Sequence, residues 1–230
     1  MKASGRYIKD VVYGANDGVI TTFAIIAGVA GAELADPRMT IILLGVANVL
    51  ADGFSMAVSN YLGSKSERDV IAKGYRDEEL EIAQDPDAER GEMTQLLREE
   101  GYSEADSESL ARLMFKNKAF FADLLMHEEF DMSGHERGPV VLGSVLTFVA
   151  FVGAGLLPVL PFFFVSNVSN IFLYSIVSTG AVLFILGALR SLITKRSFIF
   201  SGLEILVIGG FAAAIAYGVG AFLRSVLGVF

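Results

Sequence analysis

The chain contains no cysteine and no tryptophan, and only two of its 230 residues are histidine, His127 and His135. Without cysteine there is no disulfide, no thiolate metal site and no cysteine nucleophile. Two histidines are also too few for the histidine-rich sites that bind zinc or copper. If this chain binds cations, its ligands are therefore carboxylate oxygens and methionine sulfur.

Charged residues are scarce except in one block. Between Gly63 and Arg137 lie 20 of the 26 acids, together with 10 of the 18 bases, and the formal net charge of the chain is −8. That negative sign disfavours a nucleic-acid partner. The chain as a whole is too apolar for an ordinary soluble domain, since 53% of its residues are hydrophobic.

Five apolar stretches are long enough for a helix that crosses a bilayer, which needs roughly 20 residues. The first is not a signal peptide, because polar Asn16 and Asp17 lie inside it and a second stretch follows directly. Backbone in lipid must satisfy its own hydrogen bonds, so these stretches predict helices. The predicted spans are Tyr13–Ala32, Thr40–Leu62, Gly138–Val165, Ile171–Leu189 and Phe198–Leu223.

The fold class is therefore an all-α polytopic membrane protein with five transmembrane helices and a three-helix insert. We divide the chain into residues 1–62, with two spans, the acidic helical domain 63–137, and residues 138–230, with three spans. Sixteen of the 18 bases precede span one, lie in the block or lie between spans four and five. Only Arg38 and Arg224 fall on the other side, so the N-terminus and the block are predicted to be cytoplasmic.

The acidic block predicts three helices. The first, Lys65–Gln84, continues out of span two. The second begins at Pro86, its first helical residue, and Asp85 is its predicted N-cap. Ser103 is predicted to cap a third helix, with Asp106 three residues on. Its apolar stripe has helical spacing and contains Leu110, Leu113, Met114, Phe120, Phe121, Leu124 and Leu125.

Four glutamates in this block have a regular spacing. Glu78 and Glu81 share one helix face, Glu89 and Glu92 share another, and the turn at Pro86 can bring the two pairs together. Such like charges destabilise helices unless they are compensated, and a divalent cation is one compensator. The alternative is an acidic surface that is simply solvated. A ferritin-like site is not indicated, because its Glu-x-x-His motif is absent.

Polar residues also occur inside the predicted spans, where ionisable groups usually mark function. Span one contains Asp17, and Ala24, Gly28 and Gly31 give it a small-residue surface for close helix packing. In span two a polar stripe at four-residue spacing consists of Asn48, Asp52, Met56 and Asn60. The stripe fits either a cation path or hydrogen bonding between helices. Glu204 in span five is either structural or a proton site, and Pro158 and Pro161 should end or kink span three.

Several of these residues resemble motifs of the vacuolar iron transporter family, including its yeast and bacterial relatives. The run from Asp17 to Gly28 resembles the first helix of that family, and Ala51–Met56 with Tyr61-Leu62 resembles its second. The six block residues with the spacing of its cytoplasmic metal-binding helices are Glu78, Glu81, Glu89, Glu92, Met126 and Glu129. Leu125 stands where the family often has methionine, and Asn60 where it often has glutamate.

The resemblance implies a homodimer in the lipid bilayer that exports Fe²⁺ from the cytoplasm in exchange for protons. The six block residues would collect the ion, and Asp17, Asp52 and Met56 would form the translocation path. Fe²⁺ would be bound and transported without any prosthetic group, and the Leu125 and Asn60 departures make Mn²⁺ a competing substrate. We expect no enzymatic activity and a prokaryotic inner membrane, with a vacuolar membrane as the alternative. The other possible functions are a membrane-anchored metal-binding or ferroxidase protein without transport, and a structural scaffold.

Overall fold

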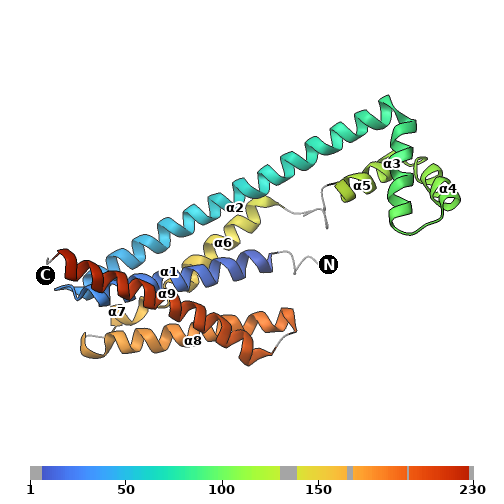
Figure 1. Ribbon diagram of the computed structural model, residues 1–230. Helices are drawn as coiled ribbons and strands as arrows, with labels where there is room; N and C mark the ends of the chain where they lie inside the picture. The colour runs from blue at the N-terminus through green and yellow to red at the C-terminus, as the bar shows by residue number, and fades with distance from the viewer. Residues whose placement is uncertain (1–6, 130–138, 165–167, 196, 228–230) are drawn as a thin grey trace. The chain divides into compact units, whose positions relative to one another are not determined.

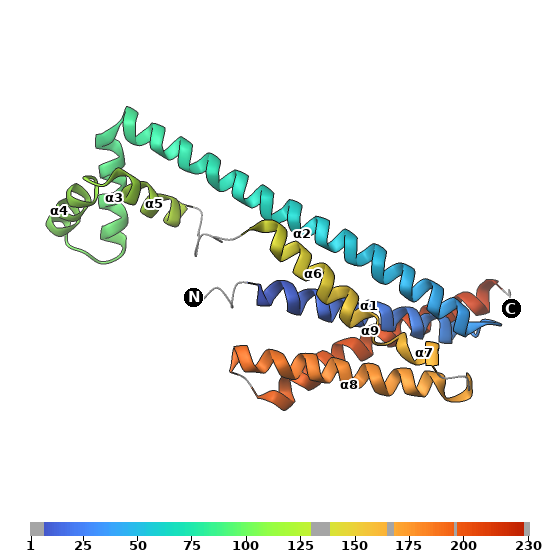
Figure 2. The ribbon, with the colours of Figure 1, turned by 180° about the vertical axis from the view of Figure 1, so that it is seen from behind.

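The computed structural model describes residues 7–129, 139–164, 168–195 and 197–227, and within these ranges it contains helices and connecting turns but no strand (Figures 1 and 2). The helical character of the predicted fold class is thus confirmed. The helices are α1 (Ile8–Ala32), α2 (Pro37–Gln84), α3 (Pro86–Glu99), α4 (Glu104–Met114), α5 (Lys118–Glu129), α6 (Val140–Gly155), α7 (Leu160–Phe164), α8 (Val168–Thr194) and α9 (Phe198–Leu227).

The chain divides into two compact units. We call Met1–Leu62 with Pro139–Phe230 the membrane unit, and Gly63–Gly138 the insert. The insert thus ends one residue beyond the predicted domain 63–137. Helix α2 runs without a break from Pro37 to Gln84, so the second span does continue into the first insert helix, as the sequence predicted.

Four helices of the described chain are long and apolar enough to cross a membrane: α1, α2, and the segments Phe172–Leu189 of α8 and Phe198–Val226 of α9. The predicted third span is interrupted instead. Helix α6 has only 16 residues and ends at Gly155, and the five-residue helix α7 begins at Leu160. The interruption includes Pro158, which lacks the N–H that a continuous helix needs. The predicted kink is confirmed, whereas the described residues contain four full-length spans and not the predicted five.

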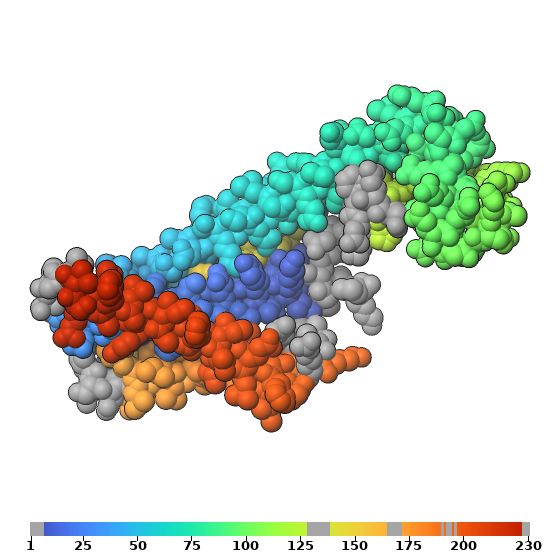
Figure 3. All heavy atoms as spheres, viewed as in Figure 1, coloured from blue at the N-terminus to red at the C-terminus, as the bar shows by residue number. Residues whose placement is uncertain are grey.

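Helix α1 is the centre of the membrane unit and packs against α6, α8 and α9. Its small-residue surface works as predicted: a Cβ on Gly31 would lie 2.2 Å from the carbonyl oxygen of Tyr217, so only glycine allows α1 and α9 this close. Helix α2 lies along one border of this unit, where its outer face is open in Figure 3. Exposed apolar side chains of α2 include Leu43, Leu50 and Phe54.

The insert is built on an apolar core shared by its helices. The buried members of this core are Ile82, Met93, Leu97, Ala111, Phe121, Ala122 and Leu125. Both predicted helix starts are confirmed. The Asp85 side chain accepts a hydrogen bond from the Ala88 N–H at 3.1 Å, and Ser103 accepts one from the Asp106 N–H at 3.2 Å.

The predicted third insert helix is wrong, because two helices occupy its range. Helix α4 ends at Met114 and α5 begins at Lys118. The Asn117 side chain accepts a hydrogen bond from the Phe120 N–H at 3.2 Å and so starts the new helix. The turn also places the Phe115 ring edge-on against Phe121, with 5.1 Å between centroids. Aromatic packing and an asparagine cap therefore override the continuous apolar stripe.

Candidate functional site

Two of the four predicted insert glutamates are buried next to one another. Glu78 lies near the end of α2 and Glu89 in the first turn of α3, so the cap at Asp85 folds one helix end back toward the other. Only 6% of Glu78 and 8% of Glu89 are exposed. Acids are almost never buried to this extent unless they are paired, which distinguishes these two from the solvated acids around them.

Electrostatics show how this pair is accommodated. Burial, then the negative charges of Glu89 and Glu81, a hydrogen bond with Glu89 and the charge of Glu92 together raise the pKa of Glu78 to about 7. Burial and the charge of Glu92 also raise the pKa of Glu89. A protonated Glu78 donates its hydrogen bond to the Glu89 carboxylate. No donor group of the described residues forms a hydrogen bond to the buried Glu78 Oε1 atom.

The other predicted ligands differ in their surroundings. Glu81 and Glu92 are exposed, although their charges act on Glu78, so the four glutamates share one neighbourhood. Met126 on α5 is only 1% exposed. The side chain of Glu129 lies outside the described residues. In the described part of the chain no three His, Asp or Glu side chains already form a group that could hold a metal ion. The helices thus gather carboxylates without arranging them as a finished coordination shell.

The membrane unit contains the other predicted site residues. Asp17 lies on α1, half-buried, and Asp52 on α2 is exposed but close enough for its charge to act on Asp17. Met56 is half-buried one turn beyond Asp52. The Thr21 hydroxyl donates at 2.8 Å to the Asp17 carbonyl oxygen of its own helix. Glu204 is exposed on α9. The structure therefore brings Asp17 and Asp52 together, with Met56 beside Asp52 on α2.

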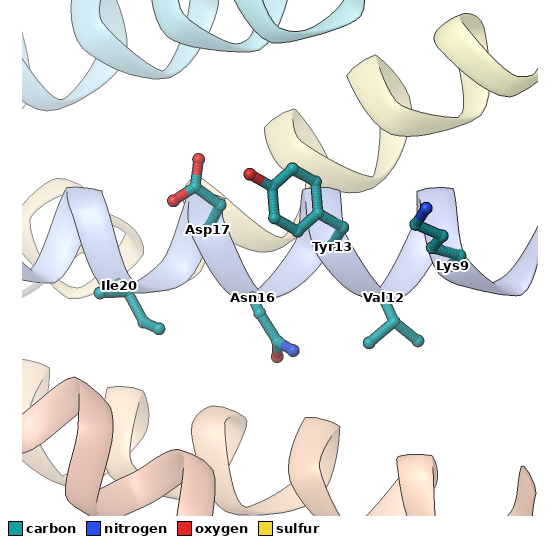
Figure 4. A pocket seen from close by; sticks show the side chains of 6 residues that line it. All are labelled: Lys9, Val12, Tyr13, Asn16, Asp17 and Ile20. Carbon is teal, nitrogen blue, oxygen red and sulfur yellow. The ribbon is translucent and has the colours of Figure 1, made fainter. Parts of the chain in front are cut away.

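An open cavity of about 350 Å³ adjoins Asp17 (Figure 4). All of its lining residues belong to α1: Lys9, Val12, Tyr13, Asn16, Asp17 and Ile20. Asp17 and Tyr13 extend from one side of the helix and Asn16 from the opposite side. The Asn16 Oδ1 atom is buried without a hydrogen-bond partner. Sequence reasoning did not assign Lys9 and Tyr13 to this region, although their positions eight and four residues before Asp17 give them the same face.

Comparison with known proteins agrees with this architecture. The model of the VIT family matches residues 8–221. A vacuolar iron transporter of Toxoplasma gondii is 34% identical, with 98% of this chain and 77% of the relative covered. One from Plasmodium falciparum is 28% identical, covering 95% and 82%. Vacuolar iron transporter 1 of Oryza sativa is also 28% identical, covering 94% and 84%.

These relatives are eukaryotic proteins, so the prokaryotic inner membrane predicted from the sequence gains no support. Their names describe transporters, which supports the expectation that this chain is not an enzyme. Together with its membrane-length helices, the match identifies an integral membrane protein. Because the family model matches nearly the whole length, the predicted resemblance to this family is confirmed, and this chain belongs to the VIT family.

Proposed function

We propose that this protein transports divalent metal, Fe²⁺ in the first place and Mn²⁺ as a second substrate, out of the cytoplasm. One observation carries the proposal. A chain of the VIT family holds two separate groups of neighbouring acids, Glu78 with Glu89 in the insert and Asp17 with Asp52 in the membrane unit. Acids placed this close repel one another, and a divalent cation relieves that repulsion.

The membrane crossing is completed by the interrupted helix. Sixteen residues of α6 span only about 24 Å, less than the roughly 30 Å of hydrocarbon. Helix α7 supplies the remaining length, and the Arg38 side chain supports it: its Nε donates to the Phe162 carbonyl oxygen at 2.9 Å. The proposed fifth span is therefore α6 with α7.

The orientation in the membrane is inferred from the distribution of the basic residues. Arg38 binds carbonyl oxygens of α7, and Arg224 forms an ion pair with Glu33 at 2.5 Å. Both therefore have local structural partners and add little to the pattern that determines orientation. The other bases leave the N-terminus and the insert on the cytoplasmic side. By analogy with the named relatives, we place the protein in a vacuolar membrane.

In the proposed cycle the insert collects the ion. The Glu78 and Glu89 carboxylates, with Glu81 and Glu92, bind Fe²⁺ as the proton between the buried pair leaves. The Met126 thioether adds a softer ligand, which favours Fe²⁺ over Ca²⁺; Glu129 is the remaining proposed ligand. The ion then passes to Asp17, Asp52 and Met56, and protons move in the opposite direction through the same carboxylates.

A second copy of the chain completes the path. An exposed aspartate is costly inside a bilayer, yet Asp52 is exposed on α2 in a single chain. We therefore propose a homodimer that covers Asp52 and the adjacent open face of α2.

Flux measurements test this function. Purified protein in liposomes, with a pH gradient imposed in either direction, should transport Fe²⁺, and Mn²⁺ more slowly. Flux should rise when the side opposite the insert is acidic, as antiport requires. Metal binding without flux for any ion would instead indicate a membrane-anchored binding protein. Oxygen consumption with Fe²⁺ would indicate a ferroxidase.

A further inference from the structure

A polar contact links three helices of the membrane unit. The Asn60 side-chain nitrogen on α2 donates to Asp10 Oδ1 on α1 at 3.0 Å and to Thr147 Oγ1 on α6 at 2.8 Å. The Thr147 hydroxyl in turn donates to the Gly143 carbonyl oxygen at 3.0 Å, and Thr147 is fully buried. We call Asp10, Asn60 and Thr147 the three-helix node.

Chemistry fixes the direction of these bonds. The Asp10 carboxylate only accepts, and the single Thr147 hydroxyl hydrogen is already donated to Gly143. Both partners of Asn60 must therefore receive hydrogens, and a side-chain amide nitrogen provides two. Neither a carboxylate nor an apolar side chain at position 60 could make this pair of bonds.

Two of the three helices are fixed to one another without the node. A Cβ on Gly14 of α1 would lie 2.5 Å from the Thr147 carbonyl oxygen, so the backbones of α1 and α6 are in direct contact. Likewise a Cβ on Gly143 would lie 2.8 Å from Asp10 Oδ2. Helices α1 and α6 therefore form a closely packed pair along this segment.

Helix α2 is held differently. Its inner face is buried, since Ile41 and Val49 are both 0% exposed. Its contacts with α6 are made through side chains, such as the Phe151 ring 3.2 Å from the Cβ position of Gly53. Side-chain contacts of this kind are not directional. The hydrogen bonds of Asn60 add directional contacts between α2 and the other two helices.

The node also has a fixed register with the acids of the proposed path. Asp10 precedes Asp17 by two turns on α1, and Asn60 follows Met56 by one turn and Asp52 by two on α2. We infer that the three-helix node sets the rotation of α2 against the α1–α6 pair, so that Asp52 and Met56 face Asp17. Asp10, Asn60 and Thr147 are thus positioning residues that do not contact the ion.

This inference depends on the proposed transport function, and variants of the full chain test it in liposomes. Asn60→Ala, which removes both bonds, should lower the maximal Fe²⁺ flux on the order of tenfold with a smaller change in KM, and Asp10→Ala, which removes one, should lower it less. The exchange variant Asp10→Asn with Asn60→Asp rebuilds the bond between positions 10 and 60 with donor and acceptor reversed, but not the bond to Thr147, so its flux should lie between those of Asn60→Ala and wild type. Exposed Ser59→Ala, on the same helix, should behave as wild type.

A distance measurement separates failure of the node from failure of transport. The chain has no cysteine, so Val11→Cys on α1 and Val58→Cys on α2, both exposed, accept spin labels at defined positions. The label distance distribution should broaden in Asn60→Ala and narrow again in the exchange variant. Wild-type protein that transports no metal, together with the expected broadening and narrowing of the distances, would contradict the proposed function and still support the role of the node. Unchanged distances, or an exchange variant no better than Asn60→Ala, overturn the node.

Discussion

The insert and the membrane unit each bring acids together, but they surround them in opposite ways. In the insert, Glu78 and Glu89 are almost fully buried and hydrogen-bonded to each other above an apolar core. In the membrane unit, Asp17 is half-buried, Asp52 is exposed, and the cavity beside Asp17 is lined by one helix. The pair Glu78 and Glu89 is therefore shielded from solvent, whereas the pair Asp17 and Asp52 is partly accessible.

This difference indicates a division of labour. Burial of Glu78 and Glu89 raises the pKa of Glu78 and favours its protonated form, so we expect any ion binding there to depend on pH. We expect a single chain to bind an ion more weakly at the exposed pair Asp17 and Asp52 than at the insert. Weak binding suits a translocation path, because the ion must leave it again. Four predictions test whether the two sites have these separate roles.

The largest effect is expected in the membrane unit. Asp17→Ala should reduce Fe²⁺ flux into liposomes to the level of empty vesicles, because it removes one of the two neighbouring path acids. Metal binding by the insert should persist in this variant. Glu33→Gln, which changes an acid outside the proposed path, serves as the matched control and should retain flux. Substantial flux in Asp17→Ala would remove Asp17 from the path.

A smaller effect is expected when the insert is neutralised. Changing Glu78, Glu81, Glu89 and Glu92 together to Gln should weaken metal binding on the order of 100-fold, since affinity follows the number of charged ligands. Flux should fall at low metal concentration and recover at saturating metal. The control changes four exposed acids of the same block, Glu67, Glu79, Glu100 and Glu108, to Gln. An equal loss of metal affinity in both variants would show that the insert attracts cations only through its overall negative charge.

The stability of the insert should depend on pH through Glu78. Its pKa is about 7 in the folded chain and near 4.5 when unfolded, so the folded state binds more protons between these values. The contribution of Glu78 to the free energy of unfolding is therefore largest below pH 4.5 and is lost as pH rises through 7, a change of at most about 3 kcal/mol. Hydrogen exchange of α3 amides, corrected for the pH dependence of the intrinsic exchange rates, measures this free energy. Glu78→Gln should abolish the dependence, and Glu79→Gln should keep it.

The smallest effect concerns sulfur. Leu125 is buried in the insert core beside Met126, and a change to Met conserves its volume, so Leu125→Met should cost less than about 1.5 kcal/mol of stability. A second thioether near the acids should raise the preference for Fe²⁺ over Mn²⁺ a few-fold in competition binding. Leu124→Met, half-buried against the same core, is the control. Identical ion preferences in all three proteins would place the thioethers outside the coordination shell.

Sequence patterns predicted the helix starts and the shared neighbourhood of the four glutamates, because caps and three-residue spacing act locally. Residues Asp85, Pro86 and Ser103 have the predicted capping roles. The same local reasoning missed the break between α4 and α5, since the contact of Phe115 with Phe121 has no signature in an apolar stripe. It also gave equal weight to four glutamates, of which only Glu78 and Glu89 are buried. The metal-ligand and path assignments themselves remain predictions.

By itself, the sequence determined that the protein is helical, that it belongs in a membrane, and which family it is a member of. These properties depend on composition, periodicity and motifs, which are local features of the sequence and need no knowledge of tertiary contacts. Only the tertiary structure decided which acids are buried and that Asn60 joins α2 to α1 and α6. The hydrogen bonds of Asn60 join residues 50 and 87 positions apart, whose meeting is set by how whole helices pack.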